Sequence, residues 1–464
     1  MTAISDLYRT AGRDALAELG RAARPIEGRD DDYDELLDEI ADRRVVLIGE
    51  ATHGSSEFYA ERARITRRLI EDHGFTVVAA EADWPDAYRV NRYVLGLSDD
   101  RSAAEALTDF RRFPTWMWRN TEVVRFVEWL REHNDKMTDP MRMVRFHGLD
   151  LYSLRASMDA VVSYLDGIDP DEAQRARQRY ACFDHVGTEG QAYGFALAYQ
   201  QAVPCESEVV AQLIALRRQA AEYASRDGWL AEDELFCAEQ NAVVVRDAEE
   251  YYQQMYRAEV SSWNLRDRHM AATLDALLDH FDRRPGPTGA GHTKVVVWEH
   301  NSHIGDARAT GMSVRGELNV GQLARQRYGG HAVALIGLTT YDGEVTAAAD
   351  WGRPARRRTV RAALPESYEH LLHEIVVDGL APARFWLSMS DPAVSEVVAQ
   401  PRLERAIGVV YRPETERASH YFPARLDQQF DVVVHLDRTS ALQPLDDIVA
   451  WEPLEPPETY PTGI

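Results

Sequence analysis

The sequence predicts an α/β protein with three layers, α/β/α, around a largely parallel sheet, and an extra helical layer or cap. Three observations support this fold class. Short apolar, β-branched runs recur along the chain, helical patterns fill most of the gaps between them, and one long stretch is helical throughout. Strands that alternate with helices typically pair in parallel. The 464 residues contain no obvious linker, so we expect a single domain over residues 1–464.

The predicted elements follow one another in a simple order. Residues 1–40 indicate an amphipathic helix followed by an acidic run. The predicted strands are 44–50, 76–81, 143–150, 294–300, 332–338, 384–389, 406–411 and 430–436. Residues 151–285 are mainly helical up to the breaker RRPGPTGAG, and we expect them to form an insertion or cap over the sheet. The proline-rich tail EPLEPPETYPTGI is expected to be irregular.

Composition excludes several classes of function. The net charge is −24, from 76 acidic and 52 basic residues, and nucleic acid is a poor partner for such a surface. No apolar run approaches the ~20 residues of a membrane helix, and the N-terminus lacks the layout of a secretory signal, so the expected location is the cytoplasm. No partner protein can be inferred. Cys182, Cys205 and Cys237 fit neither a zinc pattern nor a disulfide framework, and we interpret them as small buried or incidental residues.

Ionisable side chains follow four of the predicted strands. Ligands of open parallel sheets bind beyond the carboxyl ends of the strands, so residues placed there can meet in one site. A buried charge is costly unless it is paired or used, and four strand ends loaded alike therefore indicate a site. In chain order these residues are Glu50 and His53, then Glu81, Asp83 and Asp86, then His147 and Asp150, then Glu299, His300 and His303.

A histidine flanked by carboxylates is suited to activating water. Imidazole titrates near neutral pH, and a nearby carboxylate raises its basicity and orients the ring. The helix predicted after the first strand adds Arg62, which lies within an apolar stripe. Two interpretations of Arg62 stay open. Either it pairs with Glu50 or Glu81 or holds a substrate oxygen, or its side chain snorkels at the edge of the domain.

Other chemistries fit these residues less well. The loop GEATHG offers two glycines and a glutamate, whereas a phosphate loop needs a glycine-rich backbone and positive charge. No G-x-S-x-G elbow presents a serine nucleophile, and no organic cofactor is expected. A divalent metal is the serious alternative. Two histidines and a carboxylate, a common set for zinc, iron or manganese, could come from Glu50, His53, Glu81, His300 and His303.

Aromatic residues indicate how a substrate could be held. The stretch FRRFPTWMWRN, residues 110–120, places Phe, Trp and Arg around one proline. Core packing at the start of a helix is one explanation, and a wall for a bulky apolar substrate is the other. The residues that we assign to substrate binding are Asp83, Trp84, Trp116, Trp118 and Asn301.

Longer motifs resemble one known family. LIGEATHGSSEFYAERARITRRLIEDHGFTVVAAEADWPDAYRVNRYVLG is similar to the erythromycin esterase family, as are FPTWMWRN, WNLRDRHMAATL, WEHNSHIGDAR and RAIGVVYRPETERASHYFPARLDQQFDVVVHLD. The resemblance covers nearly the whole chain. It implies an α/β core with a deep cleft covered by helices, and hydrolysis of a macrolide lactone ester by a histidine-activated water, without a serine acyl-enzyme. The segment EADWPDAYRVNRYV resembles the broad branch of the family rather than the proven antibiotic-resistance enzymes.

The resemblance also implies roles for individual residues. Carried over by motif, these are His53 as general base, Glu50 as its partner, Glu81 as a further catalytic or water-positioning carboxylate, Arg62 as an electrostatic contributor, and His300 and His303 as site residues. We therefore expect a hydrolase of small-molecule carboxylic esters or lactones. Arg62, or a protonated His300 or His303, would stabilise the oxyanion. The alternatives are a metal-dependent hydrolase of esters or amides that uses the same cluster, and a non-catalytic binder of a small molecule.

Overall fold

The computed structural model describes residues 12–186, 190–199, 202–224, 228–255, 259–283 and 292–446. The predicted irregular tail, most of the RRPGPTGAG breaker and the beginning of the N-terminal region lie outside these ranges.

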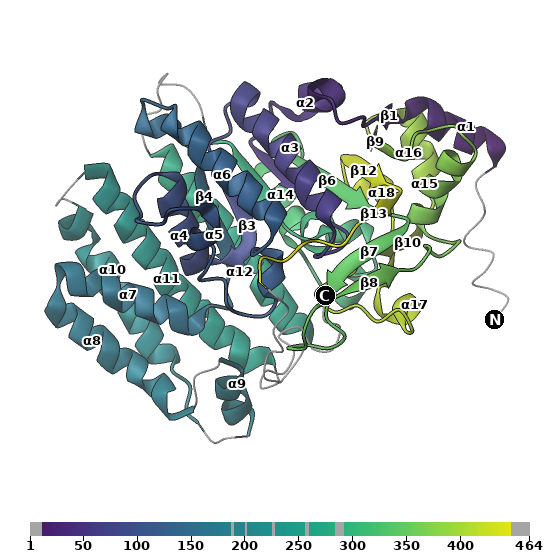
Figure 1. Ribbon diagram of the computed structural model, residues 1–464. Helices are drawn as coiled ribbons and strands as arrows, with labels where there is room; N and C mark the ends of the chain where they lie inside the picture. The colour runs from purple at the N-terminus through teal and green to yellow at the C-terminus, as the bar shows by residue number, and fades with distance from the viewer. Residues whose placement is uncertain are drawn as a thin grey trace.

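The centre of the molecule is an eight-stranded sheet, shown in Figure 1. Its spatial order is β1-β9-β12-β6-β2-β5-β3-β4, and the six strands from β12 to β4 run parallel, while β9 is antiparallel to its neighbours. The strands are β1 (Arg24–Pro25), β2 (Val45–Ile48), β3 (Val77–Asp83), β4 (Arg145–Asp150), β5 (Val295–Trp298), β6 (Val333–Thr339), β9 (Arg384–Ser388) and β12 (Val432–Leu436). Most of their residues are buried, as expected for a parallel sheet covered on both faces. The predicted α/β class with a largely parallel sheet is confirmed.

Helices cover the two faces because successive strand residues point in opposite directions. Val46 and Val296 belong to one apolar cluster, and Val45 and Val295 belong to the other. The first cluster includes α2 (Asp34–Ile40), α3 (Ser56–His73), α5 (Ala103–Ala106) and α6 (Thr121–Asp135). The second includes α1 (Arg13–Ala22), α12 (Glu259–Asp282), α14 (Val320–Tyr328), α15 (Tyr368–Val377) and α16 (Pro392–Val398), and α4 (Trp84–Val94) contributes to both.

The described chain between β4 and β5 contains helices and no strand. Before α12 these are α7 (Leu154–Ile168), α8 (Pro170–Tyr180), α9 (Gly190–Ala198), α10 (Glu206–Ala224) and α11 (Gly228–Met255). They share an apolar cluster of their own and gather at the lower left of Figure 1. The division of the chain into one domain with an inserted cap stays a prediction. Within the described ranges, the helices are all too short or too polar to cross a lipid bilayer.

The interpretation of the cysteines is wrong for two of the three. Cys182 and Cys205 form a disulfide, with their Cα atoms 6.0 Å apart. Their separation of 23 residues carries no signal by itself. The contact of α8 with α10 brings the two cysteines together, and Cys237 is free and buried.

The predicted strand at 406–411 is also wrong. This apolar segment joins no sheet and forms only isolated bridges, to Thr52 beyond the end of β2 and to Ala348. The Ile407 N–H donates to the carbonyl of Ala51 (2.8 Å), and the His53 N–H donates to the carbonyl of Ile407 (3.3 Å). The segment therefore supports the loop that carries His53.

The remaining described elements form small sheets and short helices at the edge of the central sheet. These are β7 (Asp342–Ala347), β8 (Arg356–Val360) and β13 (Arg438–Thr439) in one sheet, β10 (Arg402–Arg405) and β11 (Tyr421–Ala424) in another, and the helices α13 (Asn301–Ile304), α17 (Glu416–Ser419) and α18 (Leu426–Gln429).

Candidate active site

The ionisable residues at the ends of β2, β3, β4 and β5 lie close together because these four strands are neighbours in the sheet. β2, β5, β3 and β4 lie side by side in that order. Trp298 at the end of β5 pairs with Ile48 of β2 on one side and with Ala80 of β3 on the other. Residues just beyond these pairs therefore share one edge, although the chain makes a long helical excursion between β4 and β5.

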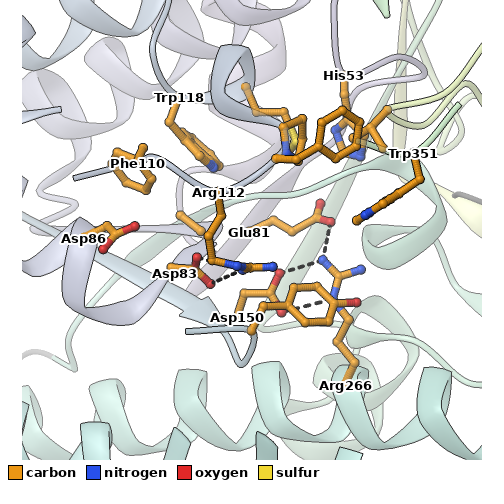
Figure 2. A pocket seen from close by; sticks show the side chains of 16 residues that line it. His53, Glu81, Asp83, Asp86, Phe110, Arg112, Trp118, Asp150, Arg266 and Trp351 are labelled. Carbon is orange, nitrogen blue, oxygen red and sulfur yellow. Dashed lines mark hydrogen bonds and ion pairs between the residues drawn. The ribbon is translucent and has the colours of Figure 1, made fainter. Parts of the chain in front are cut away.

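A cavity of about 80 Å³ lies at this edge (Figure 2). A single buried water needs ~10–15 Å³ on this measure, so the cavity has room for several waters or a small organic group. Carboxylates, guanidinium groups and one imidazole share it with aromatic side chains. The lining residues are His53, Glu81, Ala82, Asp83, Asp86, Phe110, Arg112, Phe113, Pro114, Met117, Trp118, Asp150, Tyr152, Arg266, Trp351 and Val409.

Glu50 and His53 form the pair that the three-residue spacing suggests. The Nδ1 atom of His53 lies 2.9 Å from Oε1 of Glu50. The Tyr59 hydroxyl donates to the carbonyl of His53 (3.0 Å), and the Asn301 N–H donates to the carbonyl of Glu50 (2.9 Å). A carboxylate at Nδ1 holds the proton there and leaves the lone pair on Nε2. His53 lines the cavity, and its Nδ1 side is occupied by Glu50.

Arg62 stands behind this pair. Its Nη2 atom lies 3.2 Å from Oε2 of Glu50, and its guanidinium carbon lies 4.4 Å and 4.9 Å from the ring centroids of Tyr59 and Trp298. The residue is 1% exposed, so the snorkelling interpretation is wrong. Arg62 is not one of the residues that line the cavity. It contacts Glu50, which in turn contacts Nδ1 of His53.

Glu81 is fixed from two directions. Nη2 of Arg266 donates to Oε1 (2.7 Å), and the backbone N–H of His300 donates to Oε2 (2.9 Å). Burial by itself raises the pKa of Glu81, but the nearby His303, Arg266 and His53 together hold this pKa well below its usual range. The group is an anion at neutral pH, beside the base.

Arg266 was missed by the sequence analysis. It lies on α12 and donates to both carboxylate oxygens of Asp150, from Nε at 3.0 Å and from Nη2 at 2.7 Å. Its guanidinium carbon lies 4.8 Å from the ring centroid of Tyr152. Burial lowers the pKa of Arg266, but Asp150, Tyr152 and Glu81 raise it well above its usual range. The sequence feature that could have identified Arg266 is the motif WNLRDRHMAATL, of which Arg266 is the first arginine, but this stretch is assigned to the helical cap.

His303 positions Arg266. Its Nδ1 lies 2.9 Å from a carboxylate oxygen of Asp267, and Nη1 of Arg266 lies 3.1 Å from its Nε2. The ring stacks on Trp263 with a centroid distance of 4.6 Å. Both ring nitrogens are therefore engaged, and His303 is not among the residues that line the cavity.

The surroundings of His300 disfavour its protonated form. Burial and the adjacent His53, whose ring centroid is 4.7 Å away, lower the pKa of His300 well below its usual range. Its Nδ1 accepts the Ser302 N–H (3.2 Å). The role of a protonated His300 at the oxyanion stays a prediction, and His300 is not among the residues that line the cavity. Burial, together with Glu81 and Asp267, also raises the pKa of Glu299 well above its usual range.

A second cation lines the cavity on the side of Asp83. Nη1 of Arg112 donates to Oδ2 of Asp83 (2.9 Å), and the Arg112 guanidinium carbon lies 5.2 Å from the ring centroid of Tyr152. Burial raises the pKa of Asp83 even though Arg112 opposes the shift. Tyr152 is therefore contacted by both guanidinium groups of the cavity.

Asp86 differs from the other carboxylates of the cavity. It is in the first turn of α4 and is 8% exposed. Within the described part of the chain, no hydrogen bond or ion pair reaches its carboxyl, whereas Arg112 contacts Asp83 and Arg266 contacts both Glu81 and Asp150. Burial and the neighbouring Asp83 raise the pKa of Asp86 to about 8.

We expect Asp86→Asn to stabilise the protein at alkaline pH. Because the folded pKa is raised, the carboxyl favours the folded state below its unfolded pKa of about 4, and this contribution is lost as the pH rises to about 8. The free energy of unfolding of the variant relative to the wild type should increase by up to about 1.4 kcal/mol per pH unit over that window. Urea titrations at pH 5 and pH 8.5 measure this difference; a pH-independent difference would contradict the shifted pKa.

The residues assigned to substrate binding divide into two groups. Asp83 and Trp118 line the cavity. Trp84 instead packs in the core against His147, with a centroid distance of 5.3 Å, and Trp116 packs against Phe113 at 5.3 Å. The side chain of Asn301 donates to the carbonyl of Leu338 (2.9 Å). Trp84, Trp116 and Asn301 are buried but do not line the cavity, because their side chains pack in the core or hydrogen-bond to the backbone.

The cluster considered as a metal site is engaged in other contacts. Glu50 contacts His53 and Arg62, and Glu81 accepts from Arg266. Over the described residues, no group of three or more His, Cys, Asp or Glu side chains is arranged to hold a metal ion. The divalent metal stays an alternative to be tested on the protein.

Comparisons with known proteins agree with this description. The family model described as erythromycin esterase matches residues 70–439. YbfO, a hydrolase-named protein of Bacillus subtilis (strain 168), is 24% identical over 301 residues, which are 61% of this chain and 62% of that protein. Erythromycin esterase type II of Escherichia coli is 31% identical over 125 residues, or 26% of this chain and 27% of that protein. The matches thus span less than two thirds of either relative.

Three solved structures share the fold. A succinoglycan biosynthesis protein has a TM-score of 0.73 at 20% identity, covering 94% of this chain and 99% of its own. A Bacillus cereus protein has a TM-score of 0.74 at 17% identity, covering 94% and 100%. A mutant erythromycin esterase in its open conformation has a TM-score of 0.64 at 17% identity, covering 90% and 96%.

Proposed function

The chain belongs to the erythromycin esterase family, and we propose that it is a hydrolase that cleaves a carboxylic ester or lactone by means of a water molecule activated by His53. The observation that carries this proposal is the contact of Glu50 with Nδ1 of His53, at the wall of a cavity that also holds Glu81.

The first step of the proposed reaction is proton transfer. Nε2 of His53 takes a proton from water as the water oxygen attacks the ester carbonyl, and Glu50 stabilises the resulting imidazolium through Nδ1. Glu81 is an anion beside His53 and helps to orient the water. The imidazolium then returns the proton to the departing alkoxide, which releases an acid and an alcohol.

The developing oxyanion needs a donor that faces the cavity. The predicted donors Arg62, His300 and His303 are not among the residues that line it. Arg112 and Arg266 are the cations that do. We therefore assign the electrostatic role to these two guanidinium groups, each of which can be worth ~2.7–4 kcal/mol if it meets the oxyanion.

The size of the cavity bears on the substrate. About 80 Å³ suits a small acyl group and a water molecule, whereas sites for drug-sized ligands are typically ~300–1,000 Å³. A macrolide would need the aromatic wall to move outward.

A substrate panel tests the proposal. The purified protein, with its metal content measured, is assayed against small esters, lactones, macrolides and amides before and after treatment with a chelator. We expect turnover of esters or lactones that is unchanged by the chelator. Loss of activity that added metal restores would favour a metal-dependent hydrolase. No turnover of any member, with tight binding of one of them, would favour a non-catalytic binder.

A further inference from the structure

The cavity carries more negative than positive groups. Its lining contains four carboxyl groups and two guanidinium groups. Arg266 contacts Glu81 and Asp150, and Arg112 contacts Asp83. One carboxyl, that of Asp86, therefore remains without a counter-ion among the described residues, and it is more than nine-tenths buried. A buried carboxylate is costly without a partner, so a cation supplied by a ligand would be favoured at this position.

The surroundings of Asp86 also suit a cation. Phe110 and Trp118 line the same cavity, with ring centroids 6.0 Å apart. In the view of Figure 2, Asp86 and these two rings lie on the side away from His53. Aromatic faces attract ammonium groups, most strongly where water is excluded. Another aromatic ring of the cavity, that of Tyr152, already contacts two cations, Arg112 and Arg266.

We propose that the part of the cavity formed by Asp86, Phe110 and Trp118 binds a basic amine of the substrate as its ammonium ion, while His53 acts on an ester elsewhere in the same molecule. This inference rests on the proposed function for the identity of the ligand as a substrate. The binding itself requires no turnover. It predicts that aminated esters or lactones are preferred over neutral ones of the same size.

The charged groups around Asp86 set the conditions of the test. Asp83 and Asp109 disfavour its ionised form, whereas Arg111 and Arg112 favour it. Measurements at pH 8.5 ionise a larger share of the carboxyl than measurements at pH 7. Choline, which keeps its charge at every pH, and its neutral isostere 3,3-dimethylbutan-1-ol are suitable probes.

The test is calorimetric titration of the full-length protein with each probe. We expect choline to bind at least about tenfold more tightly than the alcohol, a difference of ~1.4 kcal/mol. Asp86→Asn should remove this preference without changing the affinity for the alcohol. The control Asp135→Asn, at an exposed carboxylate of α6, should keep it. Equal affinity for the two probes, no binding of choline, or an unchanged preference in Asp86→Asn would overturn the proposal.

Two further arms separate this inference from its premises. If Asp86→Asn fails to fold, Trp118→Leu replaces it and should weaken choline selectively; equal weakening of both probes would count against the ammonium site. Titration of His53→Ala should give the wild-type affinity for choline. If the wild-type protein binds choline but hydrolyses no ester, only the catalytic proposal fails. If it hydrolyses neutral esters but does not bind choline, only the amine site is refuted.

Discussion

His53→Ala is expected to lower kcat/KM for ester or lactone hydrolysis by ~10²–10⁴-fold, the usual contribution of a positioned general base. Nε2 of this imidazole is the nitrogen available for water, because Nδ1 contacts Glu50. The folded state should be little affected. Glu50 keeps its contact with Arg62 when the imidazole is removed, so no buried carboxylate is left without a partner.

The measurement is steady-state kinetics on the best substrate of the panel, together with thermal unfolding of the same samples. His331→Ala is the matched control, because it removes an exposed imidazole and should leave both quantities unchanged. Activity of the His53→Ala variant within a few-fold of the wild type would refute the histidine-base mechanism. A large fall in the unfolding temperature would show that the loss of activity reflects structure instead.

Arg266→Met is expected to cost ~3–5 kcal/mol of folding stability at neutral pH. The substitution keeps most of the side-chain volume but removes the cation that contacts Glu81 and Asp150, which are 5% exposed each. Asp150 would then be buried without the guanidinium that contacts it, and Glu81 would lose one cationic neighbour while Nε2 of His303 stays 3.5 Å from its Oε1. Arg21→Met is the control, since its ion pair with Glu18 is on the surface and should contribute only ~0–1 kcal/mol.

The pH dependence of this loss has a defined sign. The pKa of Glu81 is lowered in the folded wild type, so its contribution to stability is present above its unfolded pKa and is lost as the pH falls. Arg266 supplies part of that shift. The difference between wild type and Arg266→Met should therefore shrink below about pH 4.5. Urea unfolding at pH 4 and pH 7 tests this expectation, and a deficit that stays constant or grows in acid would contradict it.

The sequence by itself determined the scaffold and the edge of the sheet where Glu50, His53 and Glu81 lie. Burial on both faces of a parallel strand selects runs such as Val45–Ile48, and the carboxyl ends of such strands share an edge, so Glu50, His53 and Glu81 could be expected to meet. The Glu50–His53 contact spans three residues, and local geometry is enough to produce it. Local periodicity failed at 406–411, where a largely buried apolar segment contacts the loop after β2 through isolated bridges and joins no sheet.

Only the tertiary structure decided which charged and aromatic groups reach the cavity. Arg266 contacts Glu81 across 185 residues of sequence. The sequence assigns α12, which carries Arg266, to the cap, whereas the structure packs this helix against the sheet. Arg62 and Trp84 carry the same kinds of side chain as Arg112 and Trp118, yet the first two are buried away from the lining. The physical reason is that periodicity records whether a residue is buried, whereas the packing of distant elements decides what it is buried against.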